Sequence, residues 1–99
     1  MPTKKQVLKA LEKVVDPEIG ENIVDMGFVR HVSLKANKVR VVMTLTTPFC
    51  PMANIIIYSV KEELKKLEGV KEVEVEMDFD NPWKPEMMKD DVRKRLGFD

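Results

Sequence analysis

The sequence predicts a small α+β domain whose helices and strands follow the order α-β-β-α-β-α. Apolar residues recur with helical spacing in three segments, and they alternate with polar residues in three others. The 99 residues are enough for one domain, 1–99, built around a single core. We therefore expect a compact single domain with a mixed three-stranded sheet and helices packed mainly on one side.

The first helix is predicted over about residues 4–15. Thr3 and Gln6 have the spacing of a capping box at its start. Pro17 is expected to end it, because the residue before a proline avoids the α region. The loop that follows, residues 16–27, carries four carboxylates and two glycines. The apolar residues of the helical stripe are Val7, Leu8, Leu11, Val14 and Val15.

A β-hairpin is predicted to follow this loop. The strand-like pattern begins at Phe28, although Arg30 interrupts the alternation. Residues 35–38 have the composition of a turn, and a second alternating run extends from Val39 to Thr46. Two such runs with a short polar connection are typical of an antiparallel hairpin.

The second half of the chain predicts helix, strand and helix. A helical stripe runs from Ala53 to Leu67, and a third alternating run covers residues 72–79. Because strand–helix–strand connections favour a right-handed crossover, the third strand should lie parallel to the second. The row of glutamates at 72, 74 and 76 would then lie near Lys38 and Arg40 as a solvated face. A last helix is expected from Pro85, ended by Gly97.

Composition limits the classes of function. Lys plus Arg and Asp plus Glu both number 17, so the absence of a basic excess argues against nucleic acid as the main ligand. No apolar run approaches the roughly 20 residues of a membrane helix, and the N-terminus lacks the apolar region of a signal peptide. One cysteine cannot form an internal disulfide, so we expect a cytoplasmic, reducing location.

Cys50, the only cysteine, is the strongest candidate for a functional residue. It lies at the predicted junction between the second strand and the second helix, between Pro48 and Pro51. Unpaired N–H groups and the helix dipole favour an anion there, which should lower the pKa of the thiol and raise its nucleophilicity and metal affinity. The structural alternative is that Cys50 is a small buried apolar residue.

Four polar residues are candidates to line the same site. Asp16 stands where the first helix is expected to end, an unfavourable place for a negative charge, so another interaction should hold it. It either accepts hydrogen bonds from a neighbouring turn or belongs to a site, and Glu18 follows two residues later. Thr46 and Thr47 either cap the second helix or hydrogen-bond a thiolate or a cluster sulfide.

Other candidates give weaker signals. Trp83 is expected to anchor the last helix to the body, with a partner surface as the alternative. The single histidine, His31, shows no spacing that indicates a Cys–His hydrolase. One cysteine and one histidine do not make a four-ligand zinc site. No glycine-rich phosphate loop is present, so no nucleotide is expected.

Several short motifs, in this order and spacing, resemble the SufT/PaaD-like iron–sulfur cluster assembly domain family, also called the MIP family. The match covers nearly the whole chain. The motifs are Asp16-Pro17-Glu18-Ile19, Ile23-Val24-Asp25-Met26-Gly27-Phe28-Val29, Leu45-Thr46-Thr47-Pro48-Phe49-Cys50-Pro51, Pro82-Trp83-Lys84-Pro85-Glu86-Met87 and Leu96-Gly97.

The resemblance implies a role in the maturation of iron–sulfur proteins as a carrier, adaptor or targeting factor. It also implies that Cys50 is functional, with Asp16, Glu18, Thr46 and Thr47 around it. The implied partners are iron–sulfur client proteins and a scaffold ATPase of the Mrp type. We expect a monomer or a weak homodimer.

The number of thiolates limits the mechanism. A cluster needs about four ligands, mostly thiolates, so Cys50 alone cannot hold one. Two protomers could bridge a cluster, or Cys50 could be a transient ligand during transfer; we favour the second because a labile site suits delivery. A pure adaptor without cluster contact is a further alternative. A thiol redox enzyme is disfavoured, because the chain lacks a second, resolving cysteine and an evident base.

Overall fold

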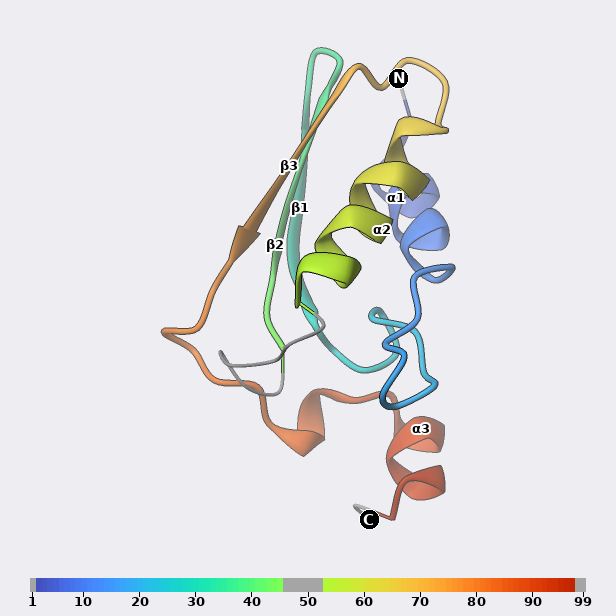
Figure 1. Cartoon of the computed structure of the whole chain (residues 1–99), viewed down its shortest axis with the longest axis vertical. Helices are drawn as coiled ribbons and strands as arrows, with labels where there is room; N and C mark the ends of the chain where they lie inside the picture. Colours follow the sequence, from blue (N-terminus) through green and yellow to red (C-terminus); the bar gives the residue numbers. More distant parts are fainter. Residues whose placement is uncertain (1, 46–52, 98–99) are drawn as a thin grey trace.

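The computed structural model describes residues 2–45 and 53–97 (Figure 1). It confirms the α+β class and the order α-β-β-α-β-α, with a short 3₁₀ helix, η1, before the last helix. No helix of the described residues is long and apolar enough to cross a bilayer. The elements are α1 (Lys4–Leu11), β1 (Val29–Lys35), β2 (Lys38–Met43), α2 (Ala53–Lys65), β3 (Glu72–Met77), η1 (Pro85–Met87) and α3 (Asp90–Arg95).

The three strands form one mixed sheet in the order β1-β2-β3. β1 and β2 are antiparallel, as the hairpin prediction requires. β3 runs parallel to β2, with Val39 opposite Val73 and Val41 opposite Val75. The expected parallel pairing is therefore confirmed, and α2 supplies the connection between these two strands.

α1 and α2 cover the same face of the sheet, and α3 lies beyond the sheet, near the loop that follows α1 (Figure 1). The core lies between α1, α2 and the sheet, and it extends to the loop after α1 and to α3 through Met26 and Val92. Burial of these side chains supplies most of the favourable free energy of folding. The largest fully buried side chains are Phe28, Leu11, Ile23, Met26, Met43, Ile56, Leu64, Val7, Val14, Val39, Val41 and Val60.

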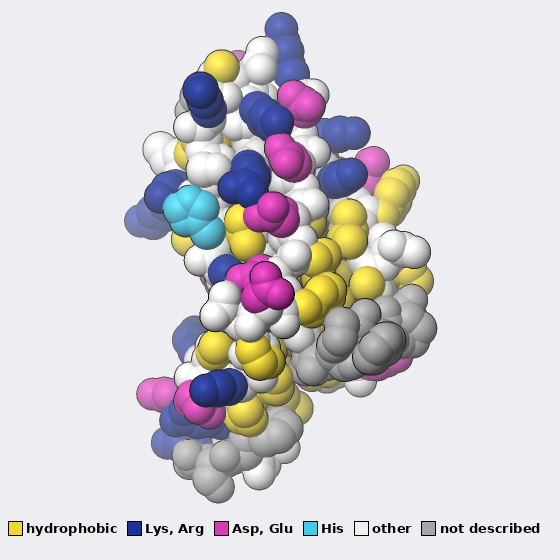
Figure 2. All heavy atoms as spheres, turned by 90° about the vertical axis from the view of Figure 1, so that its left-hand side faces the viewer, with side chains coloured by type: hydrophobic (Ala, Val, Ile, Leu, Met, Phe, Trp, Pro, Cys, Tyr) yellow, Lys and Arg dark blue, Asp and Glu magenta, His cyan; other side chains and the backbone are white. Residues whose placement is uncertain are grey.

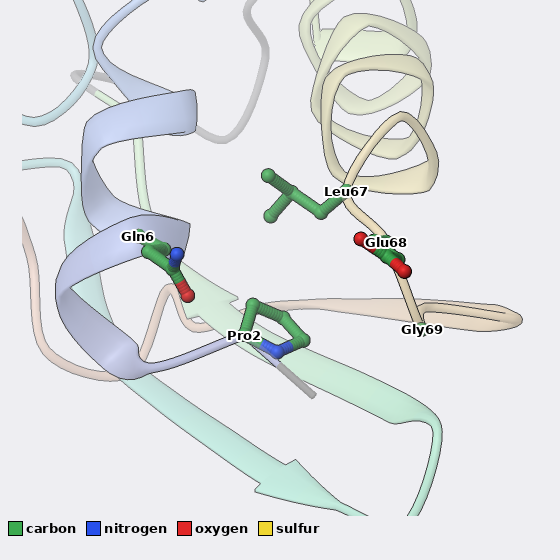
Figure 3. A pocket seen from close by; sticks show the side chains of 5 residues that line it. All are labelled: Pro2, Gln6, Leu67, Glu68 and Gly69. Atoms are coloured by element: carbon green, nitrogen blue, oxygen red, sulfur yellow. The ribbon is translucent and has the colours of Figure 1, made fainter.

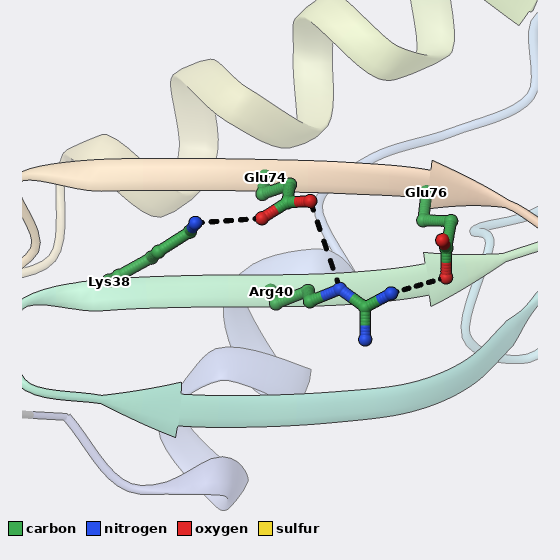
Figure 4. A network of polar contacts seen from close by, with 4 residues as sticks. All are labelled: Lys38, Arg40, Glu74 and Glu76. Carbon is green, nitrogen blue, oxygen red and sulfur yellow. Dashed lines mark hydrogen bonds and ion pairs between the residues drawn. The ribbon is translucent and has the colours of Figure 1, made fainter.

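The opposite face of the sheet is open and charged, as Figure 2 shows. Lys38 Nζ lies 2.8 Å from a carboxylate oxygen of Glu74, and Arg40 contacts both Glu74 and Glu76 (Figure 4). The hydrogen bond and the positive charge of Lys38 lower the pKa of Glu74, and Glu74 in turn raises the pKa of Lys38. The predicted pairing between the two strands is thus confirmed.

α1 is shorter than predicted, because it ends at Leu11 and not near residue 15. The backbone N–H groups of Lys13 and Val14 bond to carbonyls only three residues back, which tightens the chain into a turn. Val14 is buried, but Val15 is 49% exposed and forms an isolated bridge with Asn22. Val14 and Val15 match the helical spacing of apolar residues in the sequence, but neither belongs to the helix.

The last helix is also interrupted, in contrast to the continuous helix expected from Pro85. η1 ends at Met87, and both Met88 and Lys89 have extended backbone before α3 begins at Asp90. The break is stabilised by tertiary contacts, since Met88 is 3% exposed and the N–H of Lys89 donates to the carbonyl of Asp25. Gly97 has a φ of 83° after α3, as expected for a residue that ends a helix.

A bulge in β1 explains why Arg30 breaks the alternation of the sequence. Val29 lies opposite Met43 and His31 lies opposite Val42, so Arg30 is the extra residue on its strand. The register shift lets the residues on both sides of Arg30 keep their pairing with β2.

Candidate functional site

The structure describes three of the six predicted site residues. Cys50, Thr46 and Thr47 lie outside the described residues, and so does the predicted start of the second helix around Pro51. Asp16, Glu18 and Trp83 are described, and their surroundings define the part of the candidate site given below.

Asp16 is buried in a turn that its own side chain stabilises. It is 3% exposed, and its Oδ1 accepts a hydrogen bond of 2.9 Å from the N–H of Glu18. Its backbone N–H donates to the carbonyl of Glu21, and its carbonyl accepts from Gly20. The carboxylate thus accepts a hydrogen bond from a neighbouring turn, one of the two roles considered for it. Glu18 itself is exposed.

Asn22 organises the second half of the same loop. Its Oδ1 accepts hydrogen bonds from the N–H groups of Val24 (3.0 Å) and Asp25 (2.9 Å). The sequence reasoning did not assign Asn22 a role. The sequence signal for this role is the residue type, because an asparagine side chain in a turn often accepts hydrogen bonds from backbone N–H groups two and three residues ahead. We call residues 14–28 the acidic loop.

Phe28 joins the acidic loop to the end of β2. Its N–H donates to the carbonyl of Ile23, and its own carbonyl accepts a 2.8 Å hydrogen bond from the N–H of Thr44. Thr44 is fully buried, and Leu45 is the last described residue before position 46. The acidic loop is therefore fixed against the residues that precede the motif carrying Thr46, Thr47 and Cys50.

Trp83 holds the C-terminal part of the chain against the acidic loop. Its indole Nε1–H donates to the carbonyl of Met26 at 2.7 Å. Its ring meets Phe28 edge to face, with centroids 5.9 Å apart and an interplanar angle of 68°. This contact is the anchoring role expected of Trp83. A role in a partner surface stays a prediction.

Further contacts bind the C-terminal segment, which we define as residues 81–96, to the acidic loop. Gly27 has a φ of 76°, and a Cβ there would overlap the backbone carbonyl group of Met87. Arg95 reaches Glu21 at 3.2 Å. The acidic loop is thus held between the end of β2 and the C-terminal segment.

The described residues do not form a metal site by themselves. Nowhere in residues 2–45 and 53–97 do three or more His, Asp or Glu side chains gather in a way that could hold a metal ion. An open hollow of about 300 Å³ lies between the start of α1 and the turn before β3, where Pro2, Gln6 and Leu67 line it (Figure 3). It contains none of the predicted site residues.

Comparison with solved structures shows the class of fold to which this domain belongs. It matches the solved structure of a conserved hypothetical protein from Thermotoga maritima with a TM-score of 0.86 and 45% identity, over 97% of this chain and 95% of that chain. The two proteins therefore share the same α+β architecture over nearly their full lengths.

The chain belongs to the family described as iron–sulfur cluster assembly protein, whose model matches residues 4–77. It is 36% identical to an Fe-S protein maturation auxiliary factor of Porphyromonas gingivalis, over 99% of this chain and 94% of that protein. It is 39% identical to the Fe-S protein maturation auxiliary factor YitW of Bacillus subtilis, over 96% of this chain and 94% of that protein. The resemblance drawn from the motifs is confirmed.

Proposed function

We propose that this protein is an iron–sulfur protein maturation factor that delivers or targets clusters to client proteins through the thiol of Cys50. The observation that carries the proposal is the match, over 99% and 96% of the chain, to relatives named Fe-S protein maturation auxiliary factors. The cluster is the cargo of this activity. The relatives are not named as catalysts, so no enzymatic step is part of the proposal.

Ligand chemistry favours transient contact with the cluster. A cluster takes about four ligands, mostly thiolates, and this chain has one cysteine. The described residues add no group of three metal-binding side chains. The client, or a scaffold ATPase of the Mrp type, would supply the other thiolates in a reducing cytoplasm. Cys50 would then hold the cluster only during its transfer.

The acidic loop is proposed to line the site, with Asp16 and Glu18 as its carboxylates. Phe28, the last residue of this loop, is hydrogen-bonded to Thr44, which precedes Cys50 by six residues in the sequence. Carboxylates near Cys50 would raise the pKa of its thiol, whereas a helix start would lower it. Thr46 and Thr47 are proposed to donate hydrogen bonds to the thiolate or to a cluster sulfide.

The test compares the wild type with Cys50→Ser under anaerobic conditions. Each protein is incubated with iron and sulfide, and bound iron, absorbance and the reactivation of an apo iron–sulfur enzyme are measured. We expect cluster transfer by the wild type and its loss in Cys50→Ser, with unchanged circular dichroism as the folding control. Equal reactivation by both proteins would refute the role of the thiol. A stable cluster held by two Cys50 thiolates per dimer would refute transient contact.

A pure adaptor is the second candidate, because a chain with one cysteine cannot by itself supply the roughly four ligands, mostly thiolates, of a cluster. An adaptor would bring clients to the assembly machinery without touching the cluster. Client capture by Cys50→Ser separates the two functions: an adaptor keeps both capture and client maturation, whereas a carrier keeps capture and loses maturation. Turnover of a peroxide that depends on Cys50 would instead indicate a thiol redox enzyme.

A further inference from the structure

The outer edge of the sheet at β1 has backbone groups that are not paired with β2, although Val32 on this edge is only 6% exposed. β1 is an outer strand, with β2 on one side only. Residues 36 and 37 form the two-residue turn of the hairpin, so the pair Lys35–Lys38 is a hydrogen-bonded pair. Along an antiparallel ladder, hydrogen-bonded and non-hydrogen-bonded pairs alternate, so Leu34–Val39 and Val32–Val41 are non-hydrogen-bonded pairs. By this alternation, the N–H and C=O groups of Val32 and Leu34 face away from β2. Among the described residues, no backbone hydrogen bond from a loop or turn reaches either residue.

A hollow of about 300 Å³ lies beside this edge, between α1 and β1. Leu8 gives it an apolar wall and is 37% exposed. Of the described side chains that line it, none is acidic. The lining residues are Lys4, Leu8, Val29, Arg30, His31 and Val32.

The charge around this edge is positive although the net charge of the chain is zero. Within the described part of the chain, no ion pair involves Lys4, His31 or Lys35. Figure 2 shows Lys and Arg side chains gathered beside the histidine. The other free edge of the sheet, β3, carries Glu72, Glu74 and Glu76 on its open face. The two edges therefore differ in the sign of their nearby charge.

We propose that the β1 edge binds an extended acidic segment of a partner protein, which adds to the sheet as a fourth strand. The backbone of Val32 and Leu34 would supply the pairing, and Leu8 the apolar contact. Lys4 and Lys35 would select acidic over basic segments. Because this edge is built from described residues alone, the proposal does not depend on the role of Cys50.

The probe is a capped synthetic heptapeptide of alternating Glu and Val, with alternating Lys and Val as its counterpart. Amide hydrogen exchange of the full chain is measured by NMR with and without peptide. We expect slower exchange at Val32 and Leu34 with the acidic peptide only. The Lys4→Glu variant should bind roughly tenfold more weakly, whereas Lys65→Glu, the same charge change on α2, should bind as the wild type.

Four results would overturn the proposal. The amides of Val32 and Leu34 could stay unprotected at saturating peptide, or the basic peptide could bind equally well. Protection could also appear on β3 in place of β1. Protection of the β1 amides could also appear in the absence of peptide and increase with protein concentration. That result would mean that a second copy of the chain occupies the edge. Cys50→Ser should bind the acidic peptide as the wild type does, whatever the outcome for cluster transfer.

Discussion

The indole N–H of Trp83 donates to the backbone carbonyl of Met26 across 57 positions of the sequence. Trp83 also contacts Phe28, whose carbonyl accepts from Thr44. The C-terminal segment, the acidic loop and the end of β2 therefore form one connected unit.

Trp83→Phe should destabilise the protein by about 1–3 kcal/mol, because it leaves the carbonyl of Met26 without its donor and replaces the indole with a smaller ring against Phe28. Urea unfolding followed by circular dichroism measures the change. Tyr58→Phe is the matched control, since it removes a polar hydrogen from an aromatic side chain that is 65% exposed. Equal stability of Trp83→Phe and the wild type would show that the hydrogen bond contributes nothing.

Gly27→Ala should be far more destabilising than Gly20→Ala. Both glycines have positive φ, 76° and 81°, so both substitutions carry a backbone penalty of about 1–2 kcal/mol. A Cβ at Gly27 would also overlap Met87, whereas a Cβ at Gly20 meets nothing within 4 Å. The difference between the two variants in thermal unfolding measures the loss of stability caused by the overlap with Met87, because the backbone penalty is common to both. Similar losses would mean that the C-terminal segment moves aside without penalty.

Asp16→Asn separates the charge of Asp16 from its hydrogen bond. Asparagine keeps an oxygen that accepts from the N–H of Glu18, so Asp16→Asn should fold with little loss. Asp16→Ala leaves that N–H without its acceptor and should lose about 1–2 kcal/mol. If the carboxylate lines the site, Asp16→Asn should reduce cluster transfer in the assay used for Cys50→Ser. Normal transfer would assign Asp16 a purely structural role.

Asp78 should make stability sensitive to acid. The side chain of Asn81, with the backbone N–H of Asp80, lowers the pKa of Asp78 below its ordinary value. A lowered folded-state pKa stabilises the protein above the ordinary aspartate pKa of about 4, and this contribution is lost as the pH falls through the lowered value. NMR titration of the Asp78 carboxyl carbon checks the shift. Asn81→Ala should raise that pKa; an unchanged titration would contradict the assigned cause.

The sequence predicted the elements whose residues alternate or repeat regularly, and it failed where tertiary contacts determine the backbone. Val39 and Val41 lie buried on β2 as their alternation required. The end of α1 was misplaced because Val14 and Val15 kept the helical spacing inside a turn. The break at Met88 was missed because it depends on the contact of Lys89 with Asp25, 64 residues earlier in the chain, which no local pattern records.

The candidate site was predicted only in part. Asp16 was singled out because it was expected at a helix end, but α1 ends earlier, at Leu11, so that premise was wrong. The expectation that another interaction holds Asp16 agrees with its buried position in a hydrogen-bonded turn. Asn22 and Thr44 went unassigned, because their roles depend on backbone partners that only the folded chain brings together. Cys50, Thr46 and Thr47 lie outside the described residues, so their roles stay predictions.

The close approach of Gly27 and Met87 has a consequence for how relatives of this protein can vary. The family match ends at residue 77, whereas the atoms that exclude a side chain at position 27 belong to residue 87. A substitution of Met87 would not relieve this overlap, because the nearest atoms are the backbone carbonyl group of Met87. A relative with a larger residue in place of Gly27 should carry its C-terminal segment along a different path, and substitutions at position 27 would trace that divergence across the family.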